Sequence, residues 1–214
     1  MRQPLPAGCL FDLDGLLLDT EPLHSRAWSE SIRYFGAIAP TSLLEELRGR
    51  DRFDNAATVI EKLELKITVK DLLNIQQPIS QSLVANAMPI IGAPELIKRC
   101  KEKNIPMAIA TSSGREAVLV KMKPHPWLKQ IEVRVCGDDL FIKNAKPAPD
   151  LFIEAAKKLG LKPEECWAFE DSPAGSIAAK AAGCRVFVLP ASGLQKKDYP
   201  DGVEIIKKLE DVPI

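Results

Sequence analysis

Two aspartates separated by one residue follow an apolar run near the start of the chain. The run from Cys9 to Phe11 ends at Asp12, and Asp14 is followed directly by Gly15. Such a run is typical of a buried parallel strand, and ligands of open α/β sheets bind at the carboxyl ends of these strands. A helix cap followed by a turn is the alternative, but a turn does not need the first aspartate. Carboxylates are costly to desolvate without partners, so we expect a metal-dependent phosphoryl-transfer site.

Further polar clusters follow the other predicted strands. They are Thr111-Ser112-Ser113, Asp138-Asp139 and Glu170-Asp171. Because the carboxyl ends of parallel strands meet at one edge of a sheet, we expect these clusters to form one site with the aspartate pair.

The acidic residues of this edge predict a magnesium site. Carboxylates of Asp12, Glu170 and Asp171 would repel one another, and a hard divalent cation relieves that repulsion. A backbone carbonyl at Asp14 is expected to add a further oxygen ligand. Because Mg²⁺ favours oxygen ligands, it is the predicted cofactor. Lys146 lies in a loop with two prolines, and a lysine held there can neutralise a transferring phosphoryl group.

The phosphoryl oxygens themselves need hydrogen-bond donors. Hydroxyl and backbone N–H groups between Thr111 and Gly114 are the candidates, aided by the N-terminus of the helix that follows.

The elements that must position these residues alternate between strand and helix. Predicted strands cover 106–110, 131–136, 166–169 and 185–189, and predicted helices cover 95–103, 115–122, 149–159 and 173–182. This order indicates a Rossmann-like parallel α/β sheet with right-handed connections.

Residues 22–87 lack this alternation and show helical periodicity instead. Four helices are predicted, near 22–36, 42–49, 51–63 (capped by Asp51) and 68–84, the last with a possible interruption at Pro78. The expected organisation is therefore an α/β core of residues 1–18 and 89–214, with an inserted four-helix-type cap at 19–88.

Bulk properties narrow the class of partners. The 214 residues carry 29 basic and 29 acidic side chains, so neither nucleic acid nor a membrane surface is an expected partner. Five scattered cysteines without a C-x-x-C pair favour a reducing compartment. We see no signal peptide and no apolar run near the roughly 18 residues that a membrane span needs. The expectation is a cytoplasmic protein, with nothing that demands more than a monomer.

In this order and spacing, the motifs resemble those of the haloacid dehalogenase superfamily over nearly the whole chain. The resemblance implies that Asp12 is a nucleophile that forms an aspartyl-phosphate, and that Asp14 is the general acid and base. Thr111, Lys146 and the pair Glu170-Asp171 match the second, third and fourth motifs. Superfamily members that displace halide lack the second aspartate, so Asp14 favours phosphoryl transfer over dehalogenation.

The segment 12–28 is further similar to the β-phosphoglucomutase-like branch, whose members carry a helical cap at this place. That similarity implies substrate-binding roles for His24 and Arg52. The alternatives are a histidine satisfied within its helix, a solvated arginine face, or Arg48 or Arg50 in place of Arg52.

One departure from the mutase concerns the residues after Ser113. The mutase has a lysine and an asparagine where this chain has Gly114 and Arg115. Ser112, Ser113 and Arg115 are nevertheless expected to bind the substrate. The departure favours a Mg²⁺-dependent phosphatase of a small phosphorylated metabolite, a sugar phosphate or a nucleotide-like monophosphate. A hexose-phosphate mutase and a non-catalytic regulator that binds a phosphometabolite are the alternatives.

Overall fold

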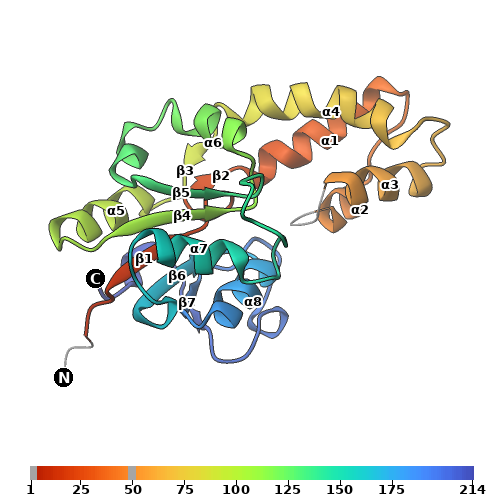
Figure 1. The fold of residues 1–214 in the computed structure, drawn as a ribbon. Helices are drawn as coiled ribbons and strands as arrows, with labels where there is room; N and C mark the ends of the chain where they lie inside the picture. The colour runs from red at the N-terminus through yellow and green to blue at the C-terminus, as the bar shows by residue number, and fades with distance from the viewer. Residues whose placement is uncertain (1–3, 48–51) are drawn as a thin grey trace. The chain divides into compact units, whose positions relative to one another are not determined.

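The computed structural model describes residues 4–47 and 52–214, which form two compact units (Figure 1). One unit contains the chain up to Asp19 together with Met88–Ile214, and the other contains Thr20–Ala87. Each unit has a hydrophobic core of its own.

The larger unit is built on a parallel sheet of six strands in the order β5-β4-β1-β6-β7-β8. The strands are β1 (Gly8–Phe11), β4 (Met107–Thr111), β5 (Val133–Cys136), β6 (Cys166–Glu170), β7 (Arg185–Val188) and β8 (Glu204–Ile205). The predicted Rossmann-like α/β fold is confirmed. Strands β4 and β5 lie on one side of β1 and β6 to β8 on the other, so the chain reverses its direction of travel at β1. A crevice forms at the carboxyl end of the strand where such a reversal occurs.

Helices cover both faces of this sheet. Because strand side chains alternate between faces, Leu10 and Ala108 point to the side where α7 (Asp150–Lys158) and α8 (Pro173–Ala182) contribute Phe152 and Ala178 to one apolar cluster.

The opposite face of the sheet carries a row of aromatic rings. The rings of Phe11 and Phe169 stack at 4.8 Å, and those of Phe169 and Phe187 at 5.4 Å. Helix α5 (Ala93–Glu102) reaches this face, since Cys100 Sγ lies 4.0 Å from Cys9 Sγ.

The smaller unit is helical, as predicted. It consists of α1 (Glu21–Tyr34), α2 (Thr41–Glu46), α3 (Arg52–Lys62) and α4 (Val69–Val84) around a core that includes Trp28, Ile32 and Leu72. The interruption expected at Pro78 is wrong, because α4 runs through the proline. A buried side that includes Leu72 and Val84 offsets the roughly 3 kcal/mol that an interior proline costs. The segment from Arg48 to Asp51 lies outside the described residues.

The sequence patterns did not predict the two-residue strands. Strands β2 (Leu18–Asp19) and β3 (Met88–Pro89) pair antiparallel where the chain leaves and re-enters the larger unit, and β8 extends the sheet. Two-residue strands have no periodicity to detect. In the part of the chain that the structure describes, no helix combines the length and the apolar character needed to cross a membrane.

Candidate active site

Asp12 lies at the end of β1, where its buried carboxylate meets Lys146. Its backbone N–H still donates to the Phe169 carbonyl at 3.0 Å, which fixes the residue to the sheet. The Lys146 ammonium lies 2.5 Å from Oδ1 of Asp12 and 2.5 Å from Oε1 of Glu170. A lysine from the loop before α7 thus bridges acidic groups from β1 and β6.

This buried environment changes the protonation of both partners. Burial raises the pKa of Asp12 to about 7; Lys146 opposes that rise, while the charges of Glu170 and Asp14 add to it. Burial lowers the pKa of Lys146, but the carboxylates of Asp12 and Glu170 raise it by more, so the net pKa lies above its ordinary value. Lys146 therefore remains a cation at physiological pH.

Asp14 has a different set of partners. The chain turns sharply after β1, with Gly15 at a φ of +82°. Oδ2 of Asp14 accepts a hydrogen bond from the Ser113 hydroxyl at 2.7 Å, and Oδ1 lies 2.5 Å from the ammonium of Lys121. Asp14 is also the more accessible aspartate, since its side chain is 20% exposed and that of Asp12 is 8% exposed. The two aspartates thus sit in separate settings.

Thr111, the last residue of β4, and the loop residues Ser112 and Ser113 lie at the same edge of the sheet. Thr111 is buried, and its hydroxyl accepts from the Ser113 backbone N–H at 3.1 Å. Ser112 is exposed. The Ser113 hydroxyl donates to Asp14, so Ser113 helps to place the candidate acid and base. The sequence predicted only a substrate-binding role for Ser113.

Arg115, the first residue of α6 (Arg115–Met122), is held by the loop after β5. Its backbone N–H donates to Asp138 Oδ1 at 2.9 Å, and its guanidinium pairs with Asp139. The hydrogen bond to Asp139 raises the pKa of Arg115. Burial raises the pKa of Asp139, but bonds from the Cys136 N–H and from Arg115 lower it by more.

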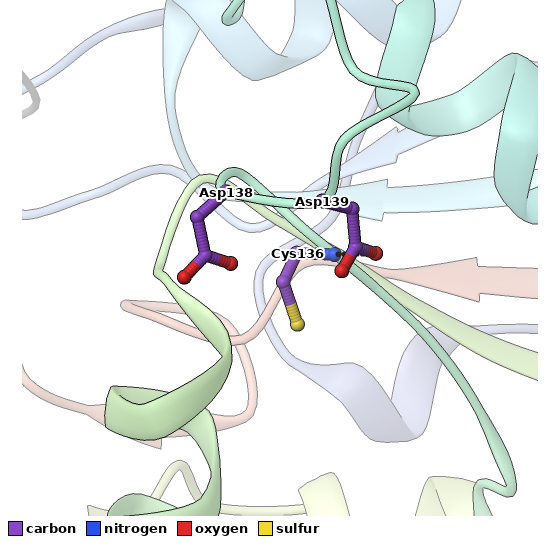
Figure 2. A group of neighbouring side chains, drawn as sticks. All are labelled: Cys136, Asp138 and Asp139. Carbon is purple, nitrogen blue, oxygen red and sulfur yellow. Dashed lines mark hydrogen bonds between the residues drawn. The ribbon is translucent and has the colours of Figure 1, made fainter.

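Figure 2 shows Cys136, the last residue of β5, beside Asp138 and Asp139 of the loop that follows. The atoms of these residues that could bind a metal lie within 4.8 Å of one another. Donors from Arg115 and from the backbone of Cys136 account for their carboxylates. We therefore assign this group to anchoring the start of α6 and not to a cation.

A second acidic group fits a divalent cation better. Asp12, Glu170 and Asp171 are buried and offer carboxylate oxygens within 4.8 Å of one another. With Asp14 they provide four carboxyl groups against the two ammonium groups of Lys121 and Lys146, an excess of two negative charges once Asp12 is also ionised. The all-oxygen donor set and this charge suit Mg²⁺.

Close backbone approach makes this acidic group possible. A Cβ on Gly15 would lie 2.1 Å from Oδ2 of Asp171. Only a glycine leaves room there, and the same glycine adopts the positive φ of the turn. This explains why Asp14 is followed by glycine.

His24 and Arg52 belong to the helical unit. His24, on α1, places Nδ1 3.2 Å from the Ser80 hydroxyl of α4, and Arg52, at the start of α3, stacks on the Phe53 ring at 5.1 Å. Their substrate-binding roles stay predictions, and the competing residues Arg48 and Arg50 lie outside the described part of the chain.

Lys121 is the site residue that the sequence analysis missed. It lies on the buried side of α6 with Val118 and Met122, and its side chain is 2% exposed. The available signal was a lysine at an inward position of a short helix, three residues after a buried valine.

With this geometry described, comparison with known proteins decides the family. The model of the haloacid dehalogenase-like hydrolases matches residues 9–189. The chain belongs to this family. The match spans the site residues from Asp12 to Asp171 and confirms the resemblance found in the motifs.

Family relatives include proteins named as phosphatases. A Drosophila melanogaster protein named “Probable pseudouridine-5'-phosphatase” is 34% identical over 95% of this chain and 90% of its own length. The (DL)-glycerol-3-phosphatase 2 of Arabidopsis thaliana is 32% identical over 94% of this chain and 87% of its own. The crystal structure of CbbY from Rhodobacter sphaeroides in complex with phosphate is similar at a TM-score of 0.82, with 25% identity and coverage of 97% and 96%. These findings support assignment as a phosphoric monoester hydrolase.

Proposed function

We propose that this haloacid dehalogenase-like hydrolase is a Mg²⁺-dependent phosphatase of a small phosphorylated metabolite and works through an aspartyl-phosphate on Asp12. The observation that supports this most directly is that the two aspartates have different partners and different solvent exposure. Asp12 is buried against Lys146, whereas Asp14 is more exposed and held by Ser113 and Lys121. Two carboxyl groups in contrasting environments suit two chemical roles.

In the first half-reaction, Asp12 acts as the nucleophile. Its carboxylate oxygen forms a bond to phosphorus while the bond from phosphorus to the ester oxygen breaks, and Asp14 donates its proton to that departing oxygen. Lys146, placed on Asp12, offsets the negative charge of the nucleophile and of the phosphoryl group.

In the second half-reaction, water replaces the ester. Asp14 accepts a proton from the water while the water oxygen bonds to phosphorus. The bond between phosphorus and the Asp12 oxygen breaks, and inorganic phosphate leaves. We expect Thr111, at the end of β4, and the exposed Ser112 that follows it to bind the phosphoryl oxygens.

Mg²⁺ would be held by Asp12, Glu170 and Asp171, whose oxygens lie together. The Asp14 carboxylate is engaged by Ser113 and Lys121, so its predicted metal contact would use the backbone carbonyl oxygen. When bound, the cation neutralises charge on the phosphoryl oxygens.

The helical unit Thr20–Ala87 is proposed as the cap that selects the substrate and excludes water. The chain passes between the units at Leu18–Glu21 and at 87–91, which we propose as the hinge. His24 and Arg52 are the proposed substrate contacts from this unit, with Ser112, Ser113 and Arg115 from the larger one.

The test is a panel of phosphate monoesters assayed with Mg²⁺ and with a chelator. It includes pseudouridine 5'-phosphate and glycerol 3-phosphate, after the names of the relatives, and several sugar phosphates. We expect phosphate release that requires Mg²⁺ and an acid-stable phosphoenzyme on Asp12. Asp12→Asn should abolish both, and turnover retained by that variant would overturn the mechanism.

The same panel separates the alternatives. Conversion of β-glucose 1-phosphate with a catalytic amount of bisphosphate, without phosphate release, would establish a mutase. Ligand binding without hydrolysis of any ester would establish a regulator. The cytoplasmic location, which the five buried free cysteines support, and the monomeric state stay predictions.

A further inference from the structure

Lys121 is a buried cation to which the proposed mechanism assigns no part in either half-reaction. Its Nζ lies 2.5 Å from Asp14 Oδ1 and 2.8 Å from the Ser113 hydroxyl oxygen, and that hydroxyl donates to Asp14 Oδ2 at 2.7 Å. The three groups form a closed triangle in which both oxygens of the Asp14 carboxylate are held.

A lysine in this position carries costs that call for an explanation. Burying an ammonium group carries a desolvation penalty, and fixing a long lysine side chain costs conformational entropy. Lys121 is 2% exposed while Asp14 is 20% exposed, so the pair faces solvent on the aspartate side alone. A pair built only to fasten α6 would gain nothing from an aspartate accessible to small molecules.

We propose that Lys121, together with Ser113, is a positioning residue that orients the Asp14 carboxylate for proton transfer. The inference rests on the proposed function, in which Asp14 gives a proton to the departing ester oxygen and later takes one from water. A carboxylate held at both oxygens cannot rotate away from the reacting oxygen, and errors of about 1 Å in such placement cost up to ~10²-fold in rate.

The test exploits the leaving group. The p-nitrophenolate of an aryl ester such as p-nitrophenyl phosphate leaves without a proton. The alkoxide of an alkyl ester such as glycerol 3-phosphate needs a proton from Asp14 to leave. Single-turnover formation of the phosphoenzyme is measured by rapid quench for both esters. Lys121→Met should slow the alkyl ester by about 10- to 100-fold, at or below the lower end of the roughly 10²- to 10⁴-fold that general acid catalysis contributes, and the aryl ester by less than about threefold. Lys123→Met, on an exposed neighbour, is the matched control and should change neither.

Further variants keep the proposal open to refutation. In an Asp14→Asn background, Lys121→Met should have no additional effect on the alkyl ester. If Lys121→Met does not fold, as judged by circular dichroism, Lys121→Arg should show the same leaving-group dependence with a smaller effect. An equal loss with both esters, or a full effect without Asp14, would overturn the role. Absence of a phosphoenzyme in the wild type would instead refute the proposed function.

Discussion

Gly175 and Glu170 lie so close that a Cβ on the glycine would be 2.0 Å from Oε1 of the glutamate and 2.1 Å from its Cδ. Gly175 is in the first turn of α8, which begins after the Ser172 cap, and its N–H donates to the Ser172 hydroxyl at 3.1 Å. The helix therefore packs its backbone directly against the carboxylate that also binds Lys146.

This contact reverses the usual effect of alanine in a helix. Gly→Ala normally stabilises a helix by about 0.5–1 kcal/mol, but Gly175→Ala should destabilise by ~1–3 kcal/mol because the methyl group displaces Glu170. Denaturation by urea measures the change. Shortening the acid with Glu170→Asp should reduce the cost of Gly175→Ala in a double-mutant cycle. A Gly175→Ala protein more stable than wild type would contradict the close approach.

Asp12 should make the metal-free protein less stable as pH rises. Its pKa of about 7 in the folded protein exceeds the ordinary 3.8, so the folded state binds more protons between these values. The free energy of unfolding contributed by this group is complete below 3.8 and falls as pH rises through about 7. Denaturation in EDTA at pH 5 and pH 8 should show a steeper loss for the wild type than for Asp12→Asn. Equal slopes would argue against a raised pKa.

Mg²⁺ should raise the melting temperature, and more at pH 8 than at pH 6. The cation binds carboxylates, so below the pKa of about 7 a proton must first leave Asp12. Affinity should then fall about tenfold for each pH unit. At 100 times Kd the stabilisation is about 2.7 kcal/mol.

Two matched variants control this metal experiment. Asp171→Asn should remove most of the response to Mg²⁺. Asp138→Asn, in the acidic group that we assign to anchoring α6, should retain it. A response lost equally in both variants would mean that the metal assignment is wrong.

Tyr199 ties the loop after β7 to the metal-binding end of β6. Its hydroxyl donates to the Asp171 carbonyl at 2.6 Å and accepts from the Ala191 N–H at 3.2 Å. The Ala191 N–H also donates directly to the Asp171 carbonyl at 3.2 Å, so Tyr199→Phe removes the hydroxyl but leaves these two groups bonded to each other. The variant should cost about 0.5–1.5 kcal/mol in the free energy of unfolding, the net value of an ordinary hydrogen bond. Tyr34→Phe, on a side chain with 68% exposure, is the matched control and should change stability by less than about 0.5 kcal/mol. Similar values for the two variants would contradict the hydroxyl's role.

Local patterns in the sequence were sufficient for the fold and for much of the site. The apolar run before Asp12 and the alternation of strands with helices predicted a parallel sheet, and all strands of a parallel sheet present their carboxyl ends at one edge. Asp12, Glu170 and Asp171 could therefore be placed together without coordinates, because strand ends are local features.

Features that depend on contacts between distant segments needed the tertiary structure. Lys121 lies 107 residues from Asp14 in the chain, and as an isolated letter in a helix it is indistinguishable from a surface lysine. The contact of Gly175 with Glu170 could not be predicted from the sequence either. Nor could the binding of the Arg115 backbone by Asp138 and of its guanidinium by Asp139. The sequence by itself determined which chemical groups reach the edge of the sheet, because strand periodicity is local. Only tertiary packing decided which of those groups hold one another in place, because hydrogen bonds and burial depend on neighbours that no local pattern identifies.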